Sequence, residues 1–161
     1  MTEKERFLGL FEWEAETTTR VLKAYPPDKL DLRPHEKSRS AKELMQTFIA
    51  EGVAMIQICD GAIDWTKVVG PDLATAEELI VAFEGMMTQV IDKIKATPGE
   101  DLEKPMDWIG RQAPRLEALM SMLFDQVHHR GQMSVYIRLA DGKVPSIYGP
   151  SADEPMEQLA Q

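Results

Sequence analysis

Asp125 and His129 have the spacing and chemistry of two metal ligands on one helix face. In the run FDQVHHRGQMSVYIRLADG, Asp125, His129, Gln132 and Tyr136 line up at i, i+4, i+7 and i+11, and residues four apart stack on one face of a helix. Imidazole and carboxylate groups suit zinc, nickel or iron(II), so this face can bind a metal ion. The alternative is a solvated ion pair, which is the commoner role of an aspartate four residues before a histidine. His128 lies about 100° from His129 around the helix and need not share its role.

The composition excludes several classes of function. The chain has 161 residues, with 18 basic and 27 acidic side chains and a net charge of −9. This balance disfavours binding to nucleic acid or to an anionic membrane surface. A lone cysteine, Cys59, excludes an internal disulfide and a cysteine-only zinc site. We find no signal peptide and no apolar stretch of the roughly 20 residues that span a bilayer. We therefore expect a cytoplasmic protein with one domain over residues 1–161.

Four segments have the apolar period of a helix, and none alternates like a strand. They cover about residues 3–23, 41–59, 75–96 and 115–140. Ser40 with Glu43 and Thr75 with Glu78 have the spacing of capping boxes, which mark helix starts. The pattern predicts an all-α four-helix bundle with long connecting loops. Loops of this length permit either up-down neighbours or crossovers, and we expect Trp108 in the last loop to pack over one end of the bundle.

Two segments are similar to one protein family. The run HHRGQMSVYIRLADGKVPSIYGPSADE, and less specifically SAKELMQTFIAEGVAM, resembles the DinB-like (DinB/YfiT-like) family. The resemblance implies a four-helix bundle with long crossovers, commonly a homodimer. It also implies a zinc or nickel ion on three histidines, one from the second helix and two from the fourth. Some relatives transfer low-molecular-weight bacterial thiols or isomerise thiol adducts.

Only part of that ligand set is present in this chain. The resemblance puts the second-helix histidine at Thr47 and the first fourth-helix histidine at Asp125, and it retains only His129. Threonine is a poor zinc ligand. Glu51, one turn after Thr47, can supply an oxygen ligand instead, although a surface or interhelical carboxylate is an equal alternative. The candidate metal ligands are therefore His129, Asp125, Glu51 and Thr47.

Two hypotheses of function follow. The ligand count favours a family member with a degenerate site that binds metal weakly or not at all and serves as a small-ligand binder or interaction module. The second hypothesis is a divalent-metal-dependent enzyme, such as a thiol-dependent transferase or isomerase, in which an open metal position lowers the pKa of a thiol or water. The sequence assigns no catalytic residue. Cys59 can be a nucleophile or a packed thiol, and the neighbouring Asp60 favours the packed thiol.

Overall fold

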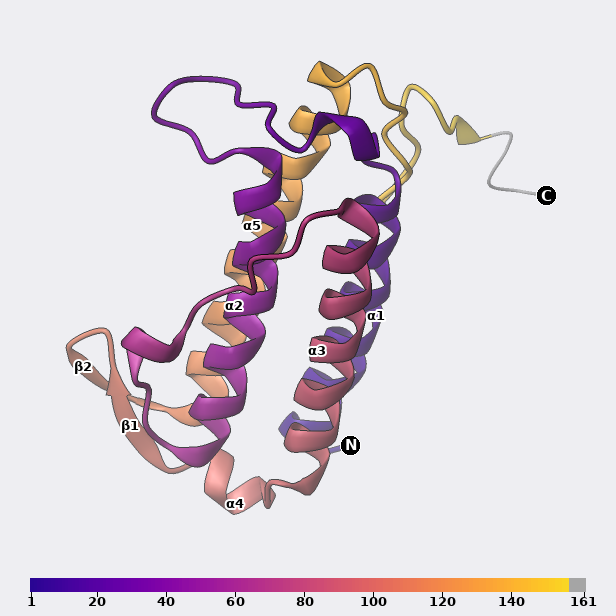
Figure 1. Cartoon of the computed structure of the whole chain (residues 1–161). Helices are drawn as coiled ribbons and strands as arrows, with labels where there is room; N and C mark the ends of the chain where they lie inside the picture. Colours follow the sequence, from indigo (N-terminus) through magenta and orange to yellow (C-terminus); the bar gives the residue numbers. More distant parts are fainter. Residues whose placement is uncertain (157–161) are drawn as a thin grey trace.

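A computed structural model describes residues 1–156, in which four long helices form a bundle (Figure 1). The helices are α1 (Glu3–Lys23), α2 (Ala41–Asp60), α3 (Ala76–Ala96) and α5 (Arg115–Leu139). The predicted boundaries agree with these to within one residue. The all-helical fold class is confirmed. Across residues 1–156, no helix is both long and apolar enough to cross a membrane.

Both predicted capping boxes form. The side chain of Ser40 accepts a hydrogen bond from the backbone N–H of Glu43, whose carboxylate accepts one from the N–H of Ser40. Thr75 and Glu78 make the same reciprocal pair at the start of α3. These bonds satisfy backbone donors that the first turn of a helix leaves free. The two capping boxes therefore fix the residues at which α2 and α3 begin.

The helices are connected across the bundle as well as between neighbours. α1 and α2 each pack against α3 and α5, so α1 and α2 lie diagonally opposite. The 24–40 connection, which contains the short 3-10 helix η1 (Pro27–Lys29), crosses one end of the bundle from α1 to α2. The 61–75 connection, which contains η2 (Trp65–Lys67), runs back along the bundle, so α2 and α3 point the same way (Figure 1). The structure therefore has the crossovers that the sequence pattern left open.

The segment between α3 and α5 differs from the prediction. After the short helix α4 (Gly99–Leu102), it forms a hairpin of β1 (Pro105–Trp108) and β2 (Arg111–Pro114). No strand pattern was recognised in this segment, and the hairpin is a small two-stranded addition to the all-helical bundle that was predicted. The strands are too short for alternation to be recognised, and their turn, Ile109-Gly110, lacks the usual Asn-Gly or Asp-Gly sequence although both residues have positive φ. Trp108 is buried, as predicted.

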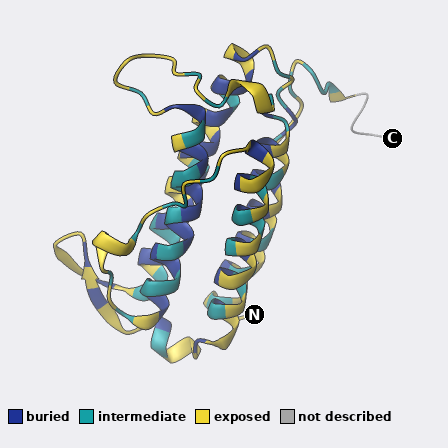
Figure 2. Cartoon of the chain, viewed as in Figure 1, coloured by how far each residue is buried: buried dark blue, intermediate teal, exposed yellow. Residues whose placement is uncertain are grey.

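The inner faces of the four helices form one apolar core. Figure 2 shows buried residues on the sides of the helices that face each other. Phe48 of α2 packs edge-on against Phe83 of α3, with ring centroids 5.9 Å apart. Met45, Met55 and Met133 are fully or almost fully buried and fill space between the larger side chains of the core. Packing on this scale removes apolar surface from water and stabilises the bundle.

Candidate metal centre

The interface between α2 and α5 brings three potential metal ligands together. Glu51 lies on the buried face of α2, because Phe48 before it and Ala54 after it are both fully buried. Asp125 and His129 lie one turn apart on α5, which packs against α2. One ligand atom from each of the three side chains lies within 4.8 Å of the others. A single ion can therefore contact all three side chains.

His129 is at the centre of the cluster. Its Nε2 lies 3.3 Å from Oε1 of Glu51 and 3.7 Å from Oδ1 of Asp125. The side chains of Glu51 and His129 are 5% and 10% exposed, whereas that of Asp125 is 51% exposed. Asp125 therefore forms the outer edge of the cluster and Glu51 its base. One nitrogen and two oxygen ligands suit zinc, nickel, iron or manganese better than a metal that requires thiolates.

The buried carboxylate of Glu51 is the least satisfied group of the cluster. Neither of its oxygens accepts a hydrogen bond from any atom of residues 1–156. Burial, and second the negative charge of Asp125, raise its pKa to about 9. A buried carboxyl group without partners costs free energy, because it loses its hydration and gains nothing in exchange. A divalent cation between Glu51 and His129 would replace that hydration, so these residues fit a metal ion.

The other ring nitrogen of His129 is held from the opposite side. Nδ1 lies 2.8 Å from Oε1 of Gln132, which is one turn further along α5. The ring also packs edge-on against Phe48 of α2, with centroids 6.2 Å apart. These two contacts fix the plane of the imidazole and direct Nε2 towards Glu51. Outer contacts of this kind orient metal-binding histidines in general.

A hollow of about 370 Å³ opens onto the three ligands. Its walls include Trp65, Val68 and Val69 from the 61–75 connection and Met122 from α5. The ring of Trp65 packs against Trp108 of the hairpin, with centroids 6.1 Å apart. The hairpin therefore supports one wall of the candidate site, although the sequence pattern predicted a loop for this segment.

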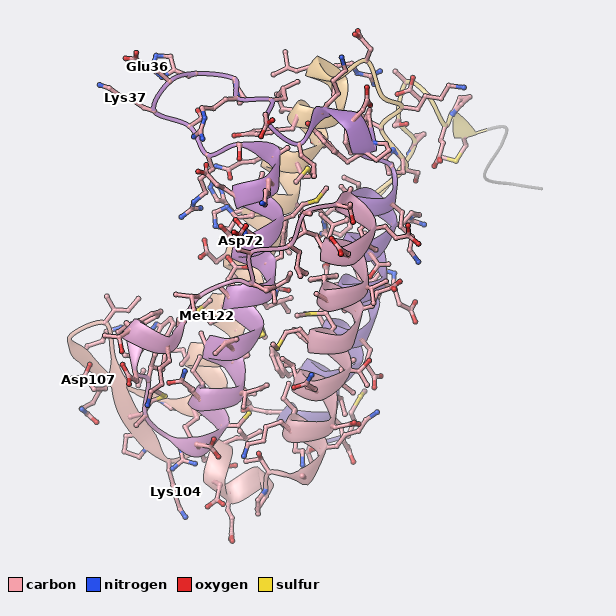
Figure 3. The ribbon with its side chains drawn as sticks, viewed as in Figure 1. Glu36, Lys37, Asp72, Lys104, Asp107 and Met122 are labelled. Atoms are coloured by element: carbon pink, nitrogen blue, oxygen red, sulfur yellow. The ribbon has the colours of Figure 1, made fainter. Side chains whose placement is uncertain are left out.

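Contacts with α2 hold the 61–75 connection over the hollow. Gln46 donates a hydrogen bond to the backbone oxygen of Pro71 at 2.8 Å, and Lys42 pairs with Asp72 at 2.7 Å. Gly70 passes so close to the backbone of Gln46 that a Cβ atom there would collide with it. In Figure 3, Asp72 marks this connection and Met122 lies beside α2 at the lower part of the same connection. The wall is therefore built by a specific close approach rather than by a loose loop.

The fourth predicted ligand, Thr47, stands apart from the cluster. It lines the hollow, but its hydroxyl donates a hydrogen bond to the backbone oxygen of Glu43 at 2.9 Å. Cys59 is buried, and burial raises the pKa of its thiol, which agrees with a packed thiol rather than a nucleophile. The sequence pattern indicated no role for Trp65. It placed Gln132 on the same helix face as His129 but did not indicate that its amide contacts the ring.

Comparison with known proteins agrees with this fold. The model of the DinB family matches residues 1–159. A Bacillus subtilis (strain 168) protein described as "Uncharacterized protein YrdA" is 27% identical over 155 residues, covering 93% of this chain and 90% of that protein. A DinB-like protein from Bacillus cereus ATCC 10987 superposes with a TM-score of 0.77 at 22% identity, covering 89% of this chain and 97% of its own. The Bacillus subtilis DinB-like protein YjoA gives a TM-score of 0.73 at 19% identity, covering 88% of this chain and 96% of its own. The two superpositions support the fold alone.

Proposed function

The chain belongs to the DinB family, and from this premise we propose that Glu51, Asp125 and His129 bind one divalent metal ion, zinc or nickel. The ion and the adjoining hollow then bind a small ligand. The observation that carries the proposal is the buried carboxylate of Glu51, 3.3 Å from Nε2 of His129 and without a hydrogen bond from residues 1–156. A buried carboxyl group without partners lowers the stability of the metal-free protein, whereas in the metal-bound protein it is a ligand of the ion.

The three ligands differ in what they contribute. His129 supplies a neutral nitrogen, and Glu51 supplies a buried negative charge. Asp125 supplies a second carboxylate at the solvent side, where it remains half exposed. Three protein ligands leave a coordination position open, as in catalytic rather than structural zinc sites. Two carboxylates and one imidazole bind zinc less tightly than three imidazoles, so we expect a weaker site than the three-histidine one that the family resemblance implies.

The hollow determines what can occupy the open position. A volume of about 370 Å³ suits a small molecule, and Trp65, Val69 and Met122 offer apolar surface to it. When bound, the metal supplies a Lewis acid that lowers the pKa of a coordinated thiol or water. The walls exclude part of the surrounding water, which strengthens electrostatic interactions inside the hollow. A small thiol is the ligand that the family resemblance favours, and a thiol-dependent transferase or isomerase is the corresponding enzyme.

A second candidate function is a metal-free small-ligand binder. The raised pKa of Glu51 favours it, because a carboxyl group with a pKa of about 9 is protonated and uncharged at neutral pH. In this form the protein keeps the bundle and the hollow and has no catalytic ion. The two candidates differ in a simple observable, which is the metal content of the purified protein.

The test is elemental analysis and zinc titration of protein purified without a metal-affinity tag. We expect the wild-type protein to bind one zinc or nickel ion per chain. Glu51→Gln and His129→Ala are expected to weaken binding by more than the roughly 10–100-fold that follows loss of an outer contact. The matched controls are Glu77→Gln and His35→Ala, since Glu77 and His35 are exposed and lie outside the three-ligand cluster.

Two results would contradict metal binding at this site. One is a wild-type protein that takes up no zinc or nickel even from millimolar solution. The other is uptake that His129→Ala and Glu51→Gln leave unchanged, which would locate the ion elsewhere. The first result would favour the metal-free binder.

We also propose that two copies of the chain associate through α5. Phe124, Val135 and Leu139 are large apolar residues on this helix, and all three are exposed. One bundle buries the opposite side of α5 and leaves these residues in water. Association of a second copy would bury them, which is the usual basis of a symmetric dimer.

A further inference from the structure

We propose that Gln132 and His128 form a hydrogen-bonded chain that keeps the proton of His129 on Nδ1 and leaves the lone pair of Nε2 free for the metal. The inference rests on the proposed function, since it concerns how the metal-binding nitrogen is prepared. Gln132 and His128 are positioning residues in this scheme, because they act through His129.

The chain consists of two short contacts on the outer side of α5. Nδ1 of His129 lies 2.8 Å from Oε1 of Gln132. Nε2 of the same glutamine amide lies 3.1 Å from Nε2 of His128. His128 and Gln132 are four residues apart, and His129 and Gln132 are three apart, so both pairs are neighbours on the helix surface. All three residues of the hydrogen-bonded chain therefore belong to α5, and no other helix is needed to position them.

The chemistry of the amide sets the direction of both hydrogen bonds. An amide oxygen only accepts, so the proton between His129 and Gln132 must be on Nδ1 of His129. An amide nitrogen only donates, so Nε2 of His128 must be the acceptor. Both histidines are then protonated on Nδ1. A reversed amide would require the opposite tautomer at both histidines, so Gln132 couples the tautomer of His128 to that of His129.

The inner side of His129 agrees with this assignment. Nε2 lies 3.3 Å from Oε1 of Glu51, yet that oxygen accepts no hydrogen bond from within the described chain. A proton on Nε2 would have to point into the cluster where the metal ion binds. With the proton on Nδ1, a neutral imidazole directs a lone pair there instead, which is the form that binds metals.

A third histidine provides an internal reference. His35, in the 24–40 connection, accepts a hydrogen bond at its Nδ1 from the backbone N–H of Lys37 at 3.1 Å. Its proton is therefore on Nε2 in the neutral ring, opposite to the arrangement at His128 and His129. The chain has three histidines in all, so each can be assigned in a spectrum.

The test is a long-range ¹H–¹⁵N NMR spectrum of metal-free wild-type protein in mildly alkaline buffer. We expect the Nδ1–H tautomer at His128 and His129 and the Nε2–H tautomer at His35. An Nε2–H tautomer at His129 overturns the proposal. This result does not depend on metal binding. If the tautomers are as expected but the protein binds no metal, the proposed function fails and the hydrogen-bonded chain stands.

Variants of Gln132 and His128 then test how the two hydrogen bonds affect zinc affinity. Gln132→Leu removes the acceptor and is expected to weaken zinc binding roughly 10–100-fold, with an Nε2–H signal appearing at His129. Gln132→Glu keeps an acceptor for Nδ1–H and is expected to retain wild-type affinity or exceed it. His128→Ala removes the second partner of the Gln132 amide and is expected to give His129 a mixture of tautomers. Equal zinc affinities for Gln132→Leu and wild type would refute the positioning role.

A control separates this effect from general destabilisation. Gln89 is an exposed glutamine on α3, and Gln89→Leu makes the same chemical change away from the cluster. It is expected to leave the zinc affinity and the spectrum of His129 unchanged. Gln132 is itself exposed, so the thermal unfolding of Gln132→Leu is expected to match that of Gln89→Leu. Rescue by Gln132→Glu then identifies the acceptor, because a purely structural role would not distinguish glutamate from leucine in this way.

Discussion

Replacing Glu51 by glutamine is expected to stabilise the metal-free protein while it removes metal binding. Glutamine has nearly the shape of glutamate and does not titrate, so the change deletes the acid–base chemistry of the site and keeps its packing. Glu51 is 4% exposed, and its pKa is raised from an ordinary value of 4.5 to about 9. Burial is the main cause, and the charge of Asp125 is the second.

The size of the effect depends on pH. In the unfolded chain Glu51 ionises near its ordinary pKa of 4.5, whereas in the metal-free fold it stays protonated up to about pH 9. Between these values the folded state binds the extra proton, so the free energy of unfolding falls by about 1.4 kcal/mol for each unit of rising pH. At about pH 7.5 the accumulated loss is on the order of 4 kcal/mol. A buried glutamine amide costs about 1–3 kcal/mol of this, so a net gain of roughly 1–3 kcal/mol remains.

The assay is urea unfolding of metal-free wild type and Glu51→Gln between about pH 5 and 8.5, the range that the two pKa values bracket. Taking the difference between the two proteins cancels every group that they share. We expect this difference to grow in favour of the variant as pH rises. The exposed control Glu77→Gln is expected to show no such trend. A variant that is less stable than wild type at about pH 7.5, or a difference that does not change with pH, would refute the assignment of Glu51 as a costly buried acid.

Three further predictions concern the metal and the assembly. Zinc affinity, measured by calorimetry, is expected to rise about tenfold for each pH unit between about pH 7 and 9, because binding must release the proton of Glu51. The double variant Thr47→His with Asp125→His is expected to bind zinc at least about tenfold more tightly than wild type, since imidazoles replace a hydroxyl and a carboxylate; an unchanged dissociation constant would show that these positions do not reach the ion. Light scattering at micromolar concentration is expected to give a dimer mass for wild type and a monomer mass for Val135→Asp with Leu139→Asp. A monomeric wild type would exclude the α5 interface.

The four long helices could be predicted because their signals are local. Capping at Ser40 and Thr75 and the apolar period along each segment specify where the helices begin and which faces they bury. The connectivity could not be predicted in this way. Which helices lie diagonally opposite depends on contacts such as the one between Gly70 and the backbone of Gln46. These residues are far apart in the sequence, so no local pattern encodes their contact. The hairpin was missed because its paired strands have four residues each.

The candidate site could be predicted in part. The spacing of Asp125 and His129 and the position of Glu51 relative to Thr47 were readable as ligand geometry. Burial was not readable, because it depends on how α5 packs against α2, and this packing puts Glu51 at the base of the site and Asp125 at its edge. The role of Trp65 could not be predicted either. It lines the hollow from a connection, where no helical or strand period assigns it a direction.

His129 and Arg130 show how one helix serves two sites. Consecutive residues lie about 100° apart on a helix, so while His129 faces the candidate metal centre, Arg130 faces α1. There it is 1% exposed and pairs with Glu14 at 2.6 Å. Tyr148, from the segment after α5, donates a hydrogen bond to the same carboxylate at 2.8 Å and accepts one from Arg130.

A buried ion pair of this kind restricts the rotation of α5 about its axis. Rotation would separate Arg130 from Glu14, and leaving either charge buried and unpaired costs about 3–5 kcal/mol. The same rotation would move Nε2 of His129 away from Glu51, because His129 and Arg130 belong to the same rigid helix. The 3.3 Å separation at the candidate metal centre is therefore maintained in part from the opposite face of α5, by a contact that touches none of the ligands.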